Sequence, residues 1–141
     1  MSSMRLAALA TVVFALVLAV PALASAPRSG ALHVTKECSD YHGLAGEHCT
    51  ITSSNLDAIP AGSRVVYASA ADFVAGVLDS DLVLHTRGAN AAYGHVVFDL
   101  ATGTGTVTFS GGTGQFKKFS ASIAVSPLGW PNFAWGGTYS Y

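Results

Sequence analysis

The clearest structural signal in this chain lies in residues 81–110, which read DLVLHTRGANAAYGHVVFDLATGTGTVTFS. Three short segments alternate apolar and polar side chains, and clusters of Gly, Asn and Thr separate them. An alternation with period two is typical of half-buried antiparallel strands joined by short turns. A turn at Asn90 and a two-residue turn at Thr102-Gly103, where glycine accepts a positive φ, would pair these segments into two hairpins.

Both hairpins place the same side chains on one face of a sheet. The turn at Asn90 sets His85 opposite His95 and Asp81 opposite Asp99. Because facing carboxylates repel, the register is open to a shift of two residues, which would keep the faces. The polar face carries Asp81, His85, His95, Asp99, Thr106, Thr108 and Ser110. The apolar face carries Leu82, Leu84, Val96, Phe98, Val107 and Phe109, and alternation extends it to Phe119, Ile123, Val125, Phe133, Trp135 and Tyr139.

The same pattern recurs along the rest of the chain and predicts eight strands, over residues 31–37, 48–55, 63–69, 81–87, 94–100, 104–110, 116–126 and 132–141. A helical turn is expected only within residues 70–78. Since no amphipathic helix is present to cover the apolar face, the sheet is expected to close on itself. The predicted fold is therefore all-β, a single eight-stranded antiparallel β-barrel over residues 25–141. Such an interior is filled by side chains or holds one small ligand.

An outer-membrane barrel is the alternative architecture, but its strands of about 9–11 residues are longer than most of those predicted here. Composition limits the partners further. The chain has 141 residues, of which 11% are charged, and a formal net charge of −1. This low charge predicts no attraction to nucleic acid or to anionic lipid, so neither is expected as a partner.

Residues 1–24 have the features of a secretory signal peptide. Arg5 precedes an uncharged apolar run over residues 6–20, Pro21 ends it, and Ala22-Leu23-Ala24 is a small-residue cleavage site. An uncleaved anchor is less expected because a spanning helix needs about 20 apolar residues. The protein is therefore predicted to be secreted, with no membrane contact after cleavage.

Cys38 and Cys49 are the two cysteines of the chain. In an oxidising compartment a disulfide between them is the expected state, and it would close a short loop. A metal site is the alternative, because His42 and His48 lie between the cysteines. Their spacing differs from the usual zinc patterns, so no metal is predicted.

Three other motifs are better explained by structural roles than by catalysis or ligand binding. The glycine cluster of residues 110–116, SGGTGQF, lacks the Lys and the following helix of a phosphate-binding loop, and predicts a hairpin with a bulge. Asp79-Ser80-Asp81 begins like a calcium loop, but Val83 occupies a ligand position. His85 and His95 could form a metal or acid–base pair, although solvated side chains on the polar face are the simpler interpretation. No cofactor is predicted.

Two polar residues share the phase of the apolar face. Asn55 is in phase with Ile51 and would point inward near a barrel mouth, where it needs a partner or a ligand. Lys36 is in phase with Leu32, which favours a lysine that extends to the rim. Glu37 would then face the other side, but the sequence leaves open which of the two enters the interior.

The stretch from residue 93 to 141 resembles the allene oxide cyclase and dirigent-like barrels. The resemblance is carried by Tyr93-Gly94-His95, by the segment FSGGTGQF at residues 109–116 and by the aromatic last strand, and more weakly by Ser54-Asn55-Leu56 and Leu32-His33-Val34. It implies an eight-stranded barrel with an apolar cavity, often in trimers, and it extends to small exported bacterial proteins of unassigned activity. Cyclases use an inward asparagine, matched by Asn55, and an inward glutamate, at whose position Lys36 stands.

These observations lead to three functional hypotheses. The favoured one is a secreted, non-catalytic barrel that binds a small apolar or aromatic ligand. A cofactor-free isomerase or cyclase acting on a hydrophobic substrate is the first alternative, and a structural or interaction barrel with a filled core is the second. The predicted ligand-binding residues are Asn55, Tyr67, Phe109, Phe119, Trp135 and Tyr139.

Overall fold

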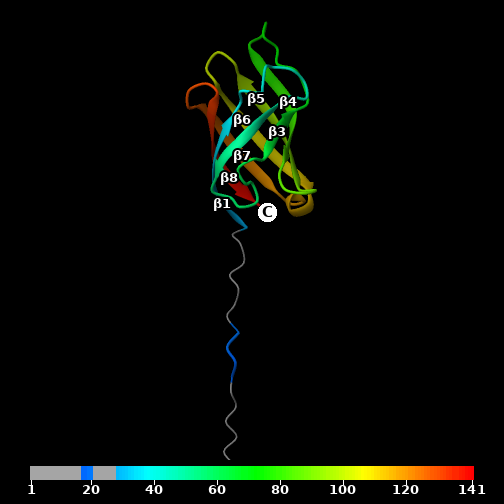
Figure 1. The fold of residues 1–141 in the computed structure, drawn as a ribbon, viewed down its shortest axis with the longest axis vertical. Helices are drawn as coiled ribbons and strands as arrows, with labels where there is room; N and C mark the ends of the chain where they lie inside the picture. Colours follow the sequence, from blue (N-terminus) through cyan, green and yellow to red (C-terminus); the bar gives the residue numbers. More distant parts are fainter. Residues whose placement is uncertain (1–16, 21–27) are drawn as a thin grey trace, which may run out of the picture.

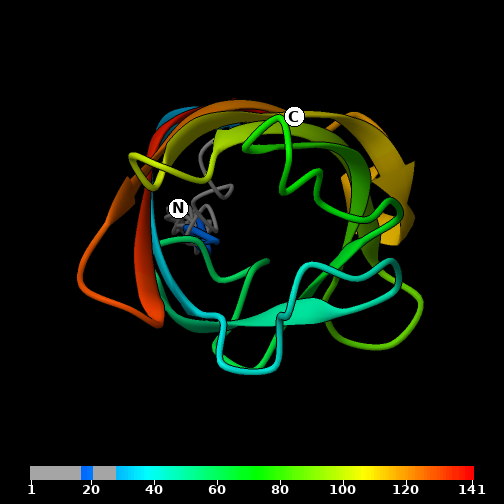
Figure 2. The same ribbon diagram turned by 90° about the horizontal axis from the view of Figure 1, so that it is seen from above.

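A computed structural model describes residues 17–20 and 28–141. In this part of the chain, eight antiparallel strands pair in sequence order, and the last closes onto the first (Figures 1 and 2). The strands are β1 (Ser29–Glu37), β2 (His48–Ser54), β3 (Arg64–Tyr67), β4 (Val77–His85), β5 (Ala91–Asp99), β6 (Thr104–Thr113), β7 (Ser120–Pro127) and β8 (Asn132–Ser140). The predicted eight-stranded antiparallel barrel is confirmed.

Most of the predicted signal peptide falls outside the described residues. Of that segment the structure describes residues 17–20, which have no regular secondary structure. Within the described residues, no helix has the length and hydropathy needed to cross a membrane.

The loops between the strands form two sets, one at each end of the barrel. We call the end formed by loops 38–47, 68–76, 100–103 and 128–131 the mouth, and the end formed by loops 55–63, 86–90 and 114–119 the base. The first strand begins at the base and ends at the mouth (Figure 1).

Alternation along the strands assigns the two faces as the sequence predicts. Leu82, Leu84, Val96, Val107, Phe109, Phe119, Ile123, Val125, Trp135 and Tyr139 are buried in the interior, and Phe98 and Phe133 are partly buried against them. All seven residues of the predicted polar face are exposed. The in-phase apolar residues therefore line one closed cylinder.

The predicted registers were wrong by even numbers of residues, so the faces survived. In the β4–β5 hairpin, Asp81 faces His95 and His85 faces Ala91, because the turn centres on Gly88, which adopts a φ of 63°. The predicted pairing of His85 with His95 is thus incorrect. The shift also removes the opposed carboxylates.

The β5–β6 connection has four residues, in contrast to the predicted two-residue turn. Asp99 faces Thr104 across its ends, and the Asp99 carboxylate accepts hydrogen bonds from the backbone N–H groups of Ala101 and Thr102. Because the Asp99 carboxylate accepts these two hydrogen bonds, the loop begins at residue 100, two residues before the predicted turn at Thr102-Gly103.

Residues 70–78, the segment that could hold a helical turn, contain no helix but a single turn at residues 73–76, in which the Gly76 N–H donates a hydrogen bond to the Asp72 carbonyl. Asp72 accepts hydrogen bonds from the backbone of Val74 and Ala75 and forms an isolated bridge with Val77, so β4 begins there, four residues earlier than predicted. Near the base, a short 3-10 helix over Gly114–Phe116 replaces the start of the predicted seventh strand. The glycine cluster does connect β6 to β7, and a register irregularity between Ala92 and Gly94 lies opposite it.

Aromatic side chains fill the base of the barrel. The ring of Phe119 lies at its centre, with centroid distances of 5.2 Å to Phe116, 5.9 Å to Phe109, 6.4 Å to Tyr139 and 5.2 Å to Tyr141. Offset and edge-to-face contacts of this kind add to the free energy gained by burying the rings. The base is therefore a packed core, and open space remains toward the mouth.

Candidate functional site

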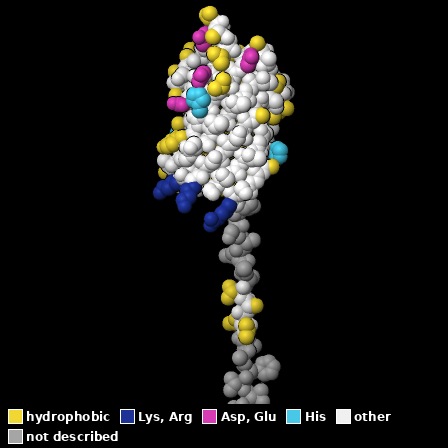
Figure 3. Space-filling model, turned by 180° about the vertical axis from the view of Figure 1, so that it is seen from behind, with side chains coloured by type: hydrophobic (Ala, Val, Ile, Leu, Met, Phe, Trp, Pro, Cys, Tyr) yellow, Lys and Arg dark blue, Asp and Glu magenta, His cyan; other side chains and the backbone are white. Residues whose placement is uncertain are grey.

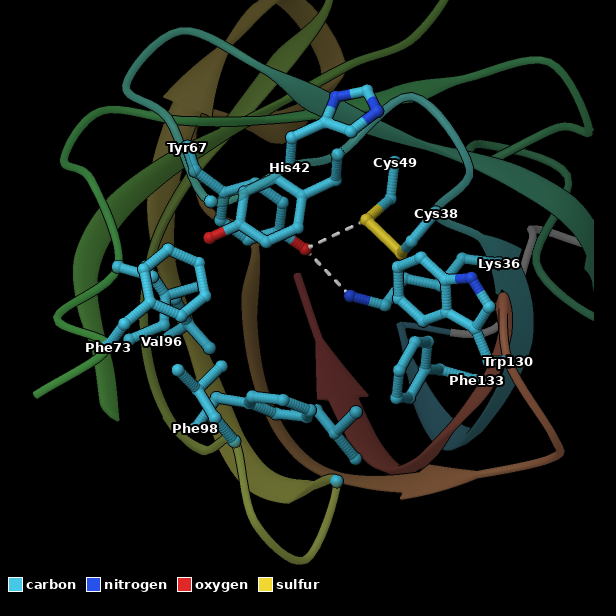
Figure 4. Close-up of a pocket in the computed structure, with 17 residues that line it drawn as sticks. Lys36, Cys38, His42, Cys49, Tyr67, Phe73, Val96, Phe98, Trp130 and Phe133 are labelled. Atoms are coloured by element: carbon cyan, nitrogen blue, oxygen red, sulfur yellow. Dashed lines mark hydrogen bonds between the residues drawn. A yellow bond between two sulfur atoms is a disulfide. The ribbon is translucent and has the colours of Figure 1, made fainter. Parts of the chain in front are cut away.

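A cavity of about 430 Å³ opens at the mouth of the barrel (Figure 4). Its wall is almost entirely apolar. The lining residues are Lys36, Cys38, Tyr41, His42, Gly43, Cys49, Tyr67, Ala71, Phe73, Leu78, Val96, Phe98, Leu100, Gly103, Val125, Trp130 and Phe133. They come from seven strands and all four mouth loops, so the cavity exists only in the closed barrel.

Lys36 is the charged residue that strand alternation directs into this cavity. It follows Leu32 and Val34 on the inner face of β1, and only 5% of its surface is exposed. A register irregularity after Thr35 lets β1 continue along β2 with Lys36 opposite Ile51. Glu37 points outward and accepts hydrogen bonds from Ser39. Lys36 thus faces the interior. The expectation that its side chain extends to solvent at the rim was wrong.

The Lys36 amine is held by aromatic groups. Its Nζ donates a hydrogen bond of 2.7 Å to the Tyr67 hydroxyl and lies 5.4 Å from the Tyr67 ring centroid. The ring centroids of Trp135 and Phe133 lie 5.2 Å and 5.7 Å from Nζ. Aromatic faces attract a cation, but less strongly than a carboxylate does. No carboxylate lines the cavity among the residues that the structure describes.

Burial shifts the pKa values of Lys36 and Tyr67 in opposite directions. Desolvation lowers the pKa of Lys36 from its ordinary value of 10.5 to about 7, because an ammonium loses its hydration without gaining a counter-ion. Burial also raises the pKa of Tyr67, with a further contribution from the neighbouring Tyr41. Near neutral pH the amine is therefore divided between its charged and neutral forms, while the phenol keeps its proton. A neutral amine is both a hydrogen-bond partner and a nucleophile.

The disulfide between Cys38 and Cys49 is present, as the sequence predicts, and it forms part of the cavity wall. It joins the mouth end of β1 to the start of β2, next to the Lys36–Tyr67 pair (Figure 4). The Tyr67 hydroxyl lies 3.5 Å from the Cys49 Sγ atom, to which it donates a weak hydrogen bond. A disulfide indicates a non-reducing compartment.

Removing the disulfide is expected to destabilise the fold. The double substitution Cys38→Ala and Cys49→Ala should lower the free energy of unfolding by about 2–3 kcal/mol, because the unfolded chain regains the freedom of the closed loop. Urea denaturation of the variant and of the oxidised wild type measures the difference. Equal midpoints and slopes would contradict the expectation, and adding a reductant to the variant, which should change nothing, is the control.

The first mouth loop carries a second polar group into the cavity. The Tyr41 ring lies 4.9 Å from that of Tyr67, and its buried hydroxyl has no hydrogen-bond partner among the described residues. Glu47 organises the loop by accepting hydrogen bonds from the backbone of His42 and Leu44, at 2.6 Å and 3.0 Å. Since a buried hydroxyl without a partner is costly, the Tyr41 phenol is available to a ligand.

Exposed apolar side chains surround the mouth. Phe73 and Trp130 are 68% and 69% exposed and still line the cavity, on opposite sides in Figure 4. Leu44, Val74 and Leu128 are exposed in the neighbouring loops. Phe73 lies against Gly43, which adopts a φ of 86° and whose missing side chain leaves room for the ring. A continuous apolar surface therefore leads from solvent to the Lys36 amine.

The residues predicted to bind a ligand fall into three groups: those at the cavity, those in the base, and Asn55. Tyr67 lines the cavity, and Trp135 lies beneath it, in contact with the Lys36 amine. Phe109, Phe119 and Tyr139 belong to the packed base and do not reach the cavity.

Asn55 was expected to point inward, and this was wrong. It is exposed beyond the base end of β2. Its side-chain oxygen accepts a hydrogen bond from the His33 backbone N–H, and its amide donates to the Ala31 carbonyl. Thr35 and Lys36 are adjacent on β1 but face Ser53 and Ile51, so Thr52 is an extra residue on β2, and this β-bulge reverses the alternation counted from Ile51. Asn55 therefore lies on the outer side, where its backbone N–H also donates a hydrogen bond to the His33 carbonyl.

Sequence reasoning missed several lining residues. Tyr41, Phe73 and Trp130 lie in loops, where no periodicity indicates which way a side chain points. Phe98 and Phe133 were placed on the inner face but not at the cavity. Lys36 was recognised as in phase with the interior, but it was expected to extend to the rim and was not among the predicted ligand-binding residues.

On the outer face, His95 forms a cluster with two aspartates. His95 lies 2.7 Å from Asp79 and 2.9 Å from Asp81, and the hydrogen bond with Asp81 is the main cause of its raised pKa. Both His85 and His95 are exposed, as expected for solvated side chains. Over residues 17–20 and 28–141, no group of three or more His, Cys, Asp or Glu side chains is arranged to hold a metal ion.

Comparison of the chain with protein-family models, with curated proteins and with solved structures finds no match. The function must therefore be argued from the cavity itself.

Proposed function

We propose that this protein binds a small, largely apolar molecule in the mouth cavity, with the Lys36 amine as its polar anchor. The observation that carries the proposal is a buried amine facing an apolar cavity of about 430 Å³ without a carboxylate among the described lining residues. Cavities that bind small molecules commonly enclose about 300–1,000 Å³ and combine an apolar wall with few polar groups. An oxygen atom of the ligand would pair with an amine that has lost its hydration.

The energetic cost of burying Lys36 supports a role in function over a role in stability. An apolar residue of similar length would fill the same place without desolvating a charge. Perturbed titratable groups in cavities are more frequent at functional sites than in ordinary cores. We further propose that the protein acts outside the cytoplasm, which agrees with its disulfide and with the leader predicted from the sequence.

The two alternatives have less support. An isomerase of the allene oxide cyclase type uses an inward carboxylate, whereas the described cavity wall carries an amine in its place. A filled core describes the base of the barrel, but the mouth holds open space beside a reactive group. Binding is the function that accounts for both the cavity and the amine.

Filling the cavity tests the proposal. Val96 points inward from β5 and lines the cavity, whereas its neighbour Val97 is 45% exposed on the outer face. We expect Val96→Phe to weaken the binding of 2-naphthalenemethanol about tenfold or more, because the larger ring occupies the ligand's space. Titration calorimetry measures the affinity.

The matched control is Val97→Phe, which adds the same ring outside the barrel and should bind within about twofold of wild type. A thermal melt of both variants verifies that they are folded. Absence of binding to the wild type, or equal losses in both variants, would contradict the proposed function.

A further inference from the structure

We infer that the Lys36 amine condenses reversibly with the carbonyl carbon of a neutral, apolar aldehyde or ketone held in the mouth cavity. The inference rests on the proposed function and adds the class of ligand and a covalent step. It depends on three features: the place of the amine in the cavity, the proton donor beside it and the charge around the mouth.

The amine is placed as a nucleophile that approaches a bound molecule from the inner end of the cavity. Figure 4 shows the Lys36 side chain directed toward Tyr67 and the disulfide, with Phe133 and Trp130 beside it and Phe98 and Phe73 across the cavity. A ligand seated among these rings would present its polar end to Nζ. The desolvated amine is neutral in part near pH 7, and the neutral form is the one that attacks a carbonyl.

Tyr67 supplies the proton transfers that such a condensation needs. Its hydroxyl lies 2.7 Å from Lys36 Nζ, and burial keeps it protonated, so it is a donor and relay near neutral pH. The nitrogen lone pair attacks the carbonyl carbon, and the carbonyl electron pair moves to oxygen. A proton passes from nitrogen to that oxygen through the Tyr67 hydroxyl and yields a carbinolamine. The second N–H proton of the amine passes to the hydroxyl oxygen through the same relay, the C–O bond breaks and water leaves, so that a neutral C=N bond remains and no oxidant or reductant is required.

The charge distribution selects a neutral ligand over an anionic one. The mouth end carries the carboxylates of Glu37, Asp40, Glu47, Asp72 and Asp99, and the described mouth loops carry no Lys or Arg. The exposed basic residues of the barrel lie at or near the opposite end, which carries one acidic loop residue, Asp57, and Figure 3 shows acidic and basic side chains gathered toward different ends; the basic residues are Arg28, Arg64, Arg87, Lys117 and Lys118. An approaching carboxylate is repelled within a Debye length of about 8 Å, whereas an uncharged carbonyl compound is not.

Reductive trapping tests the inference in the purified wild-type protein. The protein is incubated at pH 7 with 2-naphthaldehyde and sodium cyanoborohydride, which converts an imine into a stable secondary amine and leaves disulfides intact. Each adduct adds the mass of the aldehyde less one oxygen, and peptide mapping locates it. The chain contains three lysines, so Lys117 and Lys118 are internal controls that are exposed in the fold.

We expect at least about tenfold more label on Lys36 than on Lys117 and Lys118 together, since Lys36 faces the cavity that holds the aldehyde and the other two are exposed at the base. Unfolding in urea should abolish the selectivity, and excess 2-naphthalenemethanol should suppress the labelling of Lys36. Tyr67→Phe should slow the labelling of Lys36 by about tenfold or more, measured at saturating aldehyde. An unchanged rate in that variant would overturn the role of Tyr67.

The alcohol separates the two proposals, because it fits the same cavity but lacks a carbonyl. If the alcohol binds and Lys36 is not labelled, or is labelled no more than Lys117 and Lys118, the covalent step is overturned and the binding function stands. If the alcohol does not bind and no adduct forms on Lys36, both are overturned. Selective labelling that the alcohol suppresses supports both.

Discussion

Replacing Lys36 with methionine is expected to raise the free energy of unfolding by about 2–4 kcal/mol at pH 6, an unusually large stabilisation for one substitution. Lowering the pKa from 10.5 to about 7 corresponds to about 5 kcal/mol, at about 1.4 kcal/mol for each tenfold change in proton affinity. The loss of the hydrogen bond to Tyr67 offsets part of this gain, since an unpaired buried hydroxyl costs about 1–3 kcal/mol. Methionine has a similar length and carries no charge to desolvate.

The effect should depend on pH in a defined direction. In the fold, Lys36 releases its proton near pH 7, whereas the unfolded chain holds it up to about pH 10.5, so the unfolded state binds more protons in between. Wild-type stability therefore rises with pH over this window, and the advantage of the methionine variant should shrink by about 3 kcal/mol between pH 6 and pH 9.5. Tyr67 has a raised pKa, so above pH 10 its contribution to stability is lost.

Urea denaturation at pH 6, 7.5 and 9.5 measures this difference for wild type and variant. Subtracting the two cancels most contributions of the other titratable groups that line the cavity, which are Tyr41, His42 and Tyr67. Lys118→Met is the matched control, because this lysine is exposed, and it should change stability by less than about 0.5 kcal/mol at each pH. A Lys36→Met advantage that is absent at pH 6, or that does not vary with pH, would refute the assignment of a desolvated amine.

The second large effect is expected at the base of the barrel. Phe119→Ala should lower the free energy of unfolding by about 3–5 kcal/mol, because the ring is 1% exposed and the surrounding aromatic rings cannot close the space it leaves. Affinity for 2-naphthalenemethanol should not change, since Phe119 does not line the cavity. Urea denaturation and titration calorimetry measure the two quantities. If the alanine variant does not fold, Phe119→Leu, with an expected loss of about 1.5 kcal/mol or less, replaces it.

Phe73→Ala is expected to show the opposite pattern. Phe73 is largely exposed, so its removal should change stability by less than about 0.5 kcal/mol, whereas binding should weaken because the ring lines the cavity. A loss of affinity in Phe119→Ala with none in Phe73→Ala would place the ligand in the base and not in the mouth. The pair therefore tests which end of the barrel is functional.

The predicted faces were correct although the predicted registers were not. Leu84 and Val96 were expected to face each other, but the structure pairs Leu84 with Ala92, and both leucine and valine are still buried. An even shift preserves the face of every side chain. The turns fix the register, and they depend on Gly88 and on the Asp99 carboxylate, whose roles a pattern of apolar residues does not reveal.

The candidate site could be predicted only in part. Tyr67 and the phase of Lys36 followed from their strands, and the disulfide followed from the presence of two cysteines in a chain with a predicted leader. Asn55 was misplaced because a β-bulge at Thr52 reverses the alternation within β2, and nothing in the sequence indicates this bulge. Phe109 and Phe119 were assigned to a ligand because an apolar, inward residue looks the same in a sequence whether it fills a core or lines a cavity.

Alternation along an extended backbone is a local property, so the sequence alone determined the two faces of the regular strands and put Lys36 in phase with the inner one. It left open whether Lys36 or Glu37 enters the interior, and it did not reveal the β-bulge that turns Asn55 outward. Height along the barrel axis and neighbours across it are not local, because they follow from the turns and from closure of β8 onto β1. That closure collects the aromatic rings at the base and leaves the cavity at the mouth. The closed barrel also places Lys36 beside Tyr67, 31 residues away in the sequence, and removes water from the amine. This loss of hydration lowers the pKa of Lys36, so that the amine is partly neutral and nucleophilic near pH 7.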